Sequence, residues 1–95
     1  MIYEWDPVKA AANVKKHRVG FEEAASVFLD PLAVTFSDPD HSEEEDREIT
    51  IGRSAKQRVL FVAHTARAGR IRIISARRST RREQRQYEET IGEAP

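Results

Sequence analysis

The arginines in the last third of the chain are the residues best suited to chemistry. A guanidinium group is always charged, and its planar fork of donors matches two oxygens of a phosphate at once. The cluster lies where a strand pattern that begins at Arg70 gives way to a helix near Thr80. Its members are Arg77, Arg78, Arg81, Arg82 and Arg85. This arrangement predicts a phosphate-binding surface, although arginine-rich helices are often only solvated faces.

Three arginines are candidates for direct action on a phosphodiester. RNA can be cleaved when its own 2′-hydroxyl attacks the adjacent phosphorus, and the developing negative charge then needs stabilisation. We predict that Arg72 and Arg77 clamp this phosphate and that Arg47 assists from the neighbouring part of the sheet. The alternative is structural, because each could pair with a carboxylate such as Glu48 or with another protein. A regular strand also places Arg72 and Arg77 on opposite faces, so they converge only if the strand ends near Ala76.

The same reaction needs a base for the 2′-hydroxyl and an acid for the leaving 5′-oxygen. His17 is a candidate because its ordinary pKa lies nearest neutrality, but a histidine in the last turn of a helix also complements the helix dipole. His64 is flanked by apolar residues and fits a core position better. The remaining side chains able to exchange a proton are Lys16, His41, Glu83 and Tyr87. The residues predicted to bind substrate are Lys16, Arg53, Arg78, Arg81, Arg82 and Tyr87.

No metal or organic cofactor is predicted. The chain contains no cysteine, which excludes disulfides and thiolate metal sites. An acidic stretch over residues 37–46 places Asp38, Asp40, His41 and Glu43 close together. A loop of this composition without fixed geometry holds cations loosely at most, so we predict no metal site there.

The charges of this 95-residue chain are strongly segregated, although they sum to zero. Residues 37–48 carry a net charge of −6, whereas residues 49–87 carry a net charge of +10. A partner responds to the local field, so a polyanionic ligand is compatible with the neutral total. The length predicts a single domain over residues 1–95. The absence of a long apolar run and of a secretory signal predicts a soluble, cytoplasmic protein without a membrane span.

The elements that would position these residues follow in the order β-α-α-β-β-β-β-α. Strands are predicted from alternating or continuous apolar residues, and helices from apolar residues at a spacing of three and four. The predicted strands cover residues 2–5, 33–36, 47–53, 59–63 and 70–76, and the predicted helices cover residues 7–17 and 21–28 and begin again after residue 80. This order indicates an α+β domain in which the two N-terminal helices pack on an antiparallel sheet.

The C-terminal helix is predicted to be polar. Thr80 and Glu83 have the spacing of a capping box, in which each side chain bonds the backbone N–H of the other. The apolar content of the helix is Tyr87 and Ile91, with little else to bury. We therefore expect a helix that is loosely held or completed by another chain.

A family resemblance rests on short motifs spread over residues 2–89. They are Tyr3-Glu4-Trp5-Asp6-Pro7 with Lys9 and Asn13, Lys16-His17, Phe21-Glu22-Glu23-Ala24, Phe28-Leu29-Asp30-Pro31, Arg47 ahead of Ile51-Gly52, Arg58-Val59-Leu60-Phe61-Val62, Arg72-Ile73-Ile74-Ser75-Ala76-Arg77, Arg82-Glu83 and Tyr87-Glu88. Each motif is weak alone, but their order along the chain is specific. In these motifs the chain resembles the BrnT toxins of bacterial type II toxin–antitoxin modules.

The resemblance implies a ribonuclease toxin with a RelE-like fold that acts without metal or organic cofactor. It also implies a BrnA-like antitoxin with a ribbon-helix-helix DNA-binding domain, which holds the toxin inactive in a hetero-oligomer. Such a complex would repress its own operon by binding operator DNA through the antitoxin. Two alternatives stay open, a non-catalytic module that binds nucleic acid or a partner, and a degenerate toxin that acts only in operon repression.

The chain departs from the family pattern between its first two helices. The family usually has Gly, an apolar residue and then Ser, Thr or Asp before Phe, whereas this chain has Arg18-Val19-Gly20-Phe21. If Arg18 is forced into the left-handed conformation, the cost is about 1 kcal/mol. Gly20 would then cap the second helix without a side-chain hydrogen bond.

Overall fold

The computed structural model describes residues 1–40 and 46–93. The elements in order are β1 (Ile2–Glu4), α1 (Pro7–His17), α2 (Phe21–Ser26), the 3-10 helix η1 (Val27–Leu29), β2 (Val34–Ser37), β3 (Arg47–Arg53), β4 (Val59–Arg67), β5 (Arg70–Arg78) and α3 (Arg81–Glu93). The predicted second helix is present as α2 and η1 together. The predicted order of elements and the α+β class are therefore confirmed.

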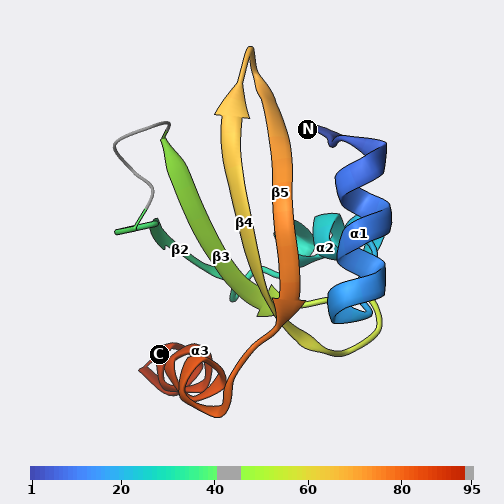
Figure 1. The fold of residues 1–95 in the computed structure, drawn as a ribbon. Helices are drawn as coiled ribbons and strands as arrows, with labels where there is room; N and C mark the ends of the chain where they lie inside the picture. Colours follow the sequence, from blue (N-terminus) through green and yellow to red (C-terminus); the bar gives the residue numbers. More distant parts are fainter. Residues whose placement is uncertain (41–45, 94–95) are drawn as a thin grey trace.

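The five strands form one sheet in the order β1-β5-β4-β3-β2 (Figure 1). Strands β2, β3, β4 and β5 are antiparallel neighbours, as predicted. β1 differs, because Ile2–Glu4 pair in parallel with residues 70–72 at the start of β5. The sheet is therefore mixed at this edge. Alternating residues predict that a strand exists, but they hold no information on its neighbour or its direction.

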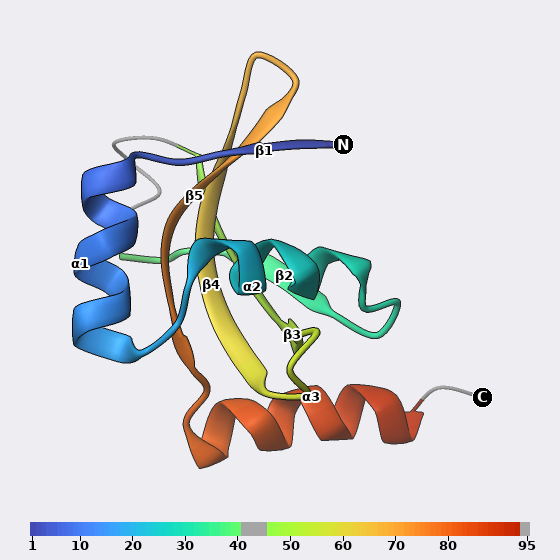
Figure 2. The same ribbon diagram turned by 90° about the vertical axis from the view of Figure 1, so that its right-hand side faces the viewer.

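The sheet separates two apolar clusters. Helices α1 and α2 lie to one side of the strands, and α3 lies at their lower end (Figures 1 and 2). The face toward α1 and α2, here called the helix face, packs Leu60, Val62, Ile73 and Ala76 against Val19, Phe21, Ala24 and Val27. The opposite face, here called the α3 face, carries Ile49, Ile51, Val59 and Ala63 with Tyr87 of α3. Successive residues of β4 thus belong to different clusters, as the pleat of a strand requires.

The hairpin of β4 and β5 is longer than predicted. Pairing continues to Arg67 and Arg70, beyond the predicted end of β4 at residue 63. The turn is Ala68-Gly69, and both residues have positive φ, 53° and 78°. His64 and Thr65 are polar, and Ala66 and Arg67 are exposed, so the apolar run that predicts the strand stops at Ala63. Gly69 tolerates its positive φ because it has no Cβ.

A β-bulge interrupts the pairing of β4 with β5. Ala63 pairs with Ser75 and His64 pairs with Ile73, so Ile74 is an additional residue in β5. An additional residue reverses the alternation of side chains beyond it. Ile73 and Ala76 accordingly both belong to the helix-face cluster although they are three residues apart.

The helix ends have the predicted geometry. Arg18 has φ 60° at the end of α1, and Gly20 caps α2 without a side-chain hydrogen bond. The capping box before α3 is present, because the N–H of Thr80 donates to Glu83 Oε1 (2.8 Å) and the N–H of Glu83 donates to Thr80 Oγ1 (3.2 Å). A left-handed arginine is strained relative to glycine at the same position.

Tyr87 holds α3 more firmly than its polar sequence suggests. Its side chain is 2% exposed, and its hydroxyl donates to Asp30 Oδ2 (2.6 Å). Burial and the neighbouring Asp30 carboxylate raise the pKa of Tyr87. The helix is therefore not loosely held at Tyr87, which corrects that alternative of the prediction. The side chain of Ile91 lies outside the part of the chain that the structure describes.

Asn13 joins α1 to the edge of β5. Its Nδ2 donates to the carbonyls of Ala76 (2.7 Å) and Val19 (2.9 Å), and its Oδ1 accepts from the N–H of Ala76 (3.1 Å). We expect Asn13→Ala to lower the free energy of unfolding by about 2–4 kcal/mol, because it leaves buried backbone groups without partners. Urea unfolding would measure this loss, with the exposed neighbour Val14→Ala as the control. A loss equal to that of the control would contradict the assigned role.

Candidate nucleic-acid interface

Three side chains of neighbouring strands form a row across the α3 face. Arg47 of β3 and Arg72 of β5 are the Cα partners of Thr65 in β4. Neighbouring strands lie about 4.8 Å apart, so the two arginine backbones are about 10 Å from each other. Long arginine side chains that start at this separation can reach one phosphate above Thr65. We call Arg47, Thr65 and Arg72 the arginine row.

The two arginines of the row differ in their surroundings. The side chain of Arg72 is half-buried, and its guanidinium makes no hydrogen bond or ion pair within residues 1–40 and 46–93. Arg47 is also half-buried, but it is engaged in an interaction. Thr65 between them is buried, and its hydroxyl donates to the carbonyl of Asp46 (3.1 Å). Arg72 is therefore the member of the row best placed to receive a ligand.

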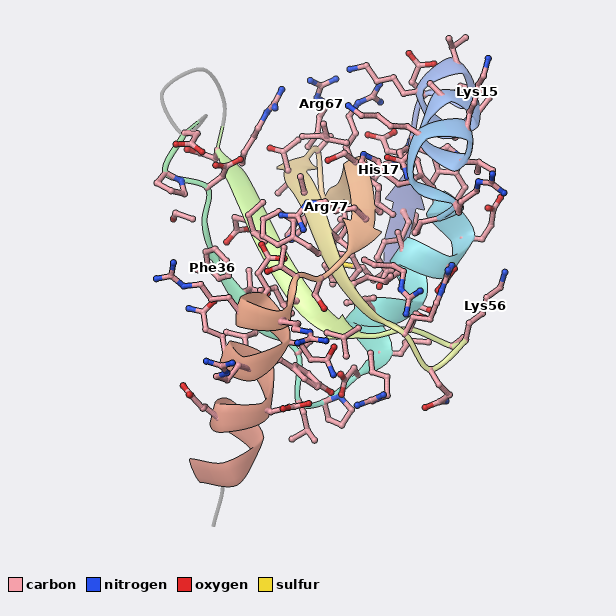
Figure 3. All side chains as sticks on the ribbon, turned by 60° about the horizontal axis from the view of Figure 1, so that its bottom comes forward. Lys15, His17, Phe36, Lys56, Arg67 and Arg77 are labelled. Carbon is pink, nitrogen blue, oxygen red and sulfur yellow. The ribbon has the colours of Figure 1, made fainter. Side chains whose placement is uncertain are left out.

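Arg77 lies on the same face but in a different environment. Its Nη1 and Nη2 donate to the two carboxylate oxygens of Glu83, each at 2.8 Å, and its guanidinium lies 4.0 Å from the centre of the Phe61 ring. Burial acts to raise the pKa of Glu83, but hydrogen bonds from Arg77 and Thr80 outweigh it, and the pKa is lowered. Arg77 is thus held in place by a carboxylate, as the structural alternative for this residue anticipates. Figure 3 shows it between α3 and the strands.

The bulge in β5 determines that Arg72 and Arg77 lie on the same face of the sheet. Arg72 pairs with Thr65 and Arg77 pairs with Phe61, and these two partners are four residues apart on β4. An even separation places both arginines on the α3 face, although β5 continues beyond Ala76 to Arg78. The expected end of the strand near Ala76 is therefore wrong, and the bulge produces the convergence instead. Four residues of strand span about 13 Å, so Arg72 and Arg77 do not face the same phosphate.

The other predicted substrate-binding residues are dispersed around α3. Arg78, Arg81 and Arg82 are exposed where β5 leads into α3. Arg53 is exposed at the far end of β3 from Arg47, and its Nη1 donates to the carbonyl of Gln57 (3.3 Å). Tyr87 of α3 is buried, and its hydroxyl donates a hydrogen bond to Asp30. None of these five belongs to the arginine row.

Lys16 and His17 lie in a separate groove between α1 and β5. The groove has a volume of about 210 Å³. Its polar lining residues are Lys9, Asn13, Lys16, His17 and Ser75, and we call it the α1–β5 groove. His17 is half-buried there, between α1 and the strands in Figure 3. The structure therefore does not bring His17 into the arginine row.

His64 is a core residue, as its apolar neighbours in sequence indicate. It is 4% exposed, its Nε2 lies 2.7 Å from the hydroxyl of Thr50, and its ring meets Phe28 edge-on. Burial lowers the pKa of His64 to about 4. It points to the helix face, away from the arginine row, and is not available to a substrate there.

The burial of His64 predicts a pH dependence of stability. The unfolded chain binds a proton below pH 6.5 that the folded chain does not take up until about pH 4. We expect the free energy of unfolding to fall by roughly 2 kcal/mol between pH 6.5 and pH 4.5. Urea unfolding across this range would measure the loss, and His64→Gln should reduce it. Equal losses in both proteins would contradict the assignment.

In the part of the chain that the structure describes, no group of three His, Asp or Glu side chains could hold a metal ion. His41 and Glu43 of the acidic stretch lie outside the described residues. Likewise, none of the described helices combines the length and apolar character of a membrane span.

The sequence motifs did not reveal two partners in the interface. Thr65 stands between the arginines only because of the strand register, and Phe61 lies under Arg77 for the same reason. Lys9 is not among the residues predicted to bind substrate, but its spacing of seven from Lys16 is a helical repeat that places both on one face. That spacing was the available signal.

A small α+β domain with arginines arrayed on one sheet face is a protein suited to binding a polyanionic strand. Residues 5–83 match the family model described as the ribonuclease toxin BrnT of type II toxin–antitoxin systems. The chain belongs to this BrnT family. Membership identifies it as a ribonuclease toxin of the type II class, and that class implies an antitoxin partner.

A solved structure supports the same fold. The chain is similar to the ribonuclease toxin BrnT of Brucella abortus, known from a crystal structure at 1.1 Å resolution. The TM-score is 0.68, the sequence identity is 23%, and the match covers 85% of this chain and 100% of that one. A search of curated proteins finds no significant match.

Proposed function

We propose that this protein is a metal-independent endoribonuclease that cleaves RNA and thereby inhibits translation. The observation that carries the proposal is the arginine row, in which Arg47 and Arg72 flank Thr65 on the α3 face. Two guanidiniums converging on one phosphate can stabilise the negative charge that develops on its oxygens. Family membership supports the class of reaction, and the row is where we propose that the reaction occurs.

In the proposed reaction the RNA provides its own nucleophile. The 2′-oxygen forms a bond to phosphorus as its proton passes to a base, and the bond from phosphorus to the 5′-oxygen breaks as that oxygen takes up a proton. The products are a 2′,3′-cyclic phosphate and a 5′-hydroxyl. Arg47 and Arg72 stabilise the phosphorane between these steps, and Arg72 contributes most because it has no competing partner among the described residues.

Arg77 has a different role in this proposal. Its donors already bind Glu83, so an incoming phosphate must compete with that carboxylate. We therefore assign Arg77 to positioning, with its guanidinium over Phe61 shaping the surface beside the row. The exposed Arg78, Arg81 and Arg82 would attract the RNA strand toward this surface.

The proposed partner is an antitoxin that covers the interface. By resemblance it is BrnA-like, carries a ribbon-helix-helix domain and forms a hetero-oligomer that binds operator DNA. The protein would act on RNA in the cytoplasm. Co-expression with a BrnA-like antitoxin, followed by purification of a complex, tests the partner separately from the ribonuclease activity.

Incubation of the purified protein with RNA, with and without a chelator, tests the ribonuclease proposal. We expect cleavage that the chelator does not reduce, with cyclic phosphate and 5′-hydroxyl ends. Cleavage that requires added metal would overturn the metal-independent mechanism. Salt-dependent RNA binding without products would instead support the non-catalytic binding module.

A further inference from the structure

We infer that the α1–β5 groove binds the backbone of a single RNA strand beyond the arginine row, with Lys9 and Lys16 on separate phosphates. This inference rests on the proposed function and extends its substrate site to a second surface. Lys9 and Lys16 are exposed, and both line the groove. They are seven residues apart on α1, or about 10 Å along the helix axis, a spacing that lets each contact its own phosphate of an extended strand.

The orientation of the two lysines is fixed by the residue between them. Asn13 lies four residues after Lys9 and three before Lys16, and its amide is bonded to the backbone of Ala76 in β5. Positions at this spacing share one face of a helix. The hydrogen bonds of Asn13 therefore turn Lys9 and Lys16 toward the same edge of the sheet.

The charge of the groove is not balanced by the protein itself. Helix α1 contains three lysines and no carboxylate. The ammonium groups of Lys9 and Lys16 make no ion pair or hydrogen bond with any residue that the structure describes. In a chain of zero net charge, such a surface produces a local positive field that favours an anionic ligand.

The groove lies along β5, the strand that carries Arg72 of the arginine row. β1 covers the edge of β5 only at residues 70–72, and beyond them α1 lies beside that edge (Figure 1). Ser75, next to the bulge, is exposed and lines the groove only three residues after Arg72. A strand held at Arg72 on the α3 face can thus turn over Ser75 to reach Lys16. This turn around a sheet edge suits a flexible single strand and not a stiff duplex.

The lining favours phosphates over a protein segment. Its apolar members are Ala12 and the half-buried Ile74, and the other side chains are ammonium, amide, hydroxyl and imidazole groups. Protein interfaces are usually centred on large apolar or aromatic anchors, which this groove does not offer in its lining. Ammonium groups at intervals are the arrangement expected for contacts with a nucleic-acid backbone.

Binding of a 2′-O-methyl oligoribonucleotide across a series of salt concentrations tests the inference, because this probe cannot be cleaved. The double variant Lys9→Gln/Lys16→Gln should bind about tenfold more weakly, and its slope of log K against log salt should be about 1.4 smaller, for two lost phosphate contacts. Lys15→Gln is the matched control, since Lys15 lies on the same helix but does not line the groove. Figure 3 shows Lys15 on the outer side of α1.

The possible outcomes separate the groove from the catalytic proposal. A slope and affinity of the double variant equal to those of Lys15→Gln would overturn the groove, even if the wild type cleaves ordinary RNA. Loss of affinity for a protein partner with unchanged RNA binding would also overturn it. A wild type that binds the probe with the expected lysine dependence but never cleaves RNA would overturn only the ribonuclease mechanism.

Discussion

Replacement of Arg72 by alanine is expected to lower RNA cleavage by a factor of about 10²–10³, the usual loss when one donor to a developing oxyanion is removed. Arg72 lies in the arginine row opposite Arg47 and has no ion pair among the described residues. Its removal therefore breaks no described side-chain hydrogen bond or ion pair. Single-turnover cleavage of a short RNA would measure the effect, and circular dichroism would check that the fold is retained.

Two further variants make the Arg72 experiment specific. Arg72→Lys keeps the charge but loses the planar fork, so its activity should lie between those of the wild type and the alanine variant. Arg67→Ala removes the same charge from the exposed end of the hairpin, where Figure 3 shows Arg67 away from Arg77. Cleavage by Arg72→Ala at the rate of Arg67→Ala would remove the arginine row from the mechanism.

Arg77 is a less informative probe of catalysis. Its alanine variant would lose the two hydrogen bonds to Glu83 and the contact with Phe61, and Glu83 also caps α3 through Thr80. Loss of activity could then arise from displacement of α3 as readily as from the loss of a phosphate contact. Cleavage and stability measured together therefore distinguish the two residues. Arg72→Ala should reduce cleavage with little loss of stability, whereas Arg77→Ala should reduce both.

Local signals in the sequence predicted local structure well. The capping box of Thr80 and Glu83 and the left-handed Arg18 each depend on residues within a few positions of one another. The pattern of apolar residues likewise predicts the central strands. Tyr87 stands out in the sequence as an apolar residue of α3. These features depend on side-chain type and spacing, which the sequence states directly.

Features that depend on register were not predictable. The bulge at Ile74 decides that Arg72 and Arg77 share a face, but no residue near it differs from those of a regular strand. The parallel pairing of β1 depends on the path of the chain through both helices. Glu83 was considered as an acid or base, whereas its bond to Arg77 arises because β5 turns directly into α3. The sequence therefore names candidate side chains by type but does not give their arrangement.

Replacement of Arg58 by alanine is expected to lower the free energy of unfolding by about 3–5 kcal/mol. The contacts of Arg58 are also with residues distant in the sequence. Its Nε donates to Glu23 Oε2 (2.9 Å), and its Nη2 donates to Glu23 Oε1 and to the carbonyl of Arg18 (3.2 Å). Ser54 Oγ also donates to Glu23 (2.7 Å). These bonds join α2 and the strained end of α1 to the start of β4. Glu23 is only 8% exposed, so removal of Arg58 leaves a buried carboxylate without its counter-charge.

The pH dependence of this loss identifies its cause. The hydrogen bond from Arg58 lowers the pKa of Glu23, so in the wild type the stabilisation is present above the ordinary pKa of 4.5 and is lost as the pH falls through the lowered value. In Arg58→Ala, the largest cause that lowers the pKa of Glu23 is gone, so burial raises this pKa relative to the wild type against the remaining hydrogen bond from Ser54, and protonation would relieve the buried charge. The deficit relative to the wild type should thus be largest near pH 7 and shrink below pH 4.5. Urea unfolding at both pH values would measure it, and a deficit independent of pH would show that lost packing, not the unpaired Glu23, is responsible. The double variant Glu23→Gln/Arg58→Ala should recover part of the loss at pH 7, because no buried charge remains.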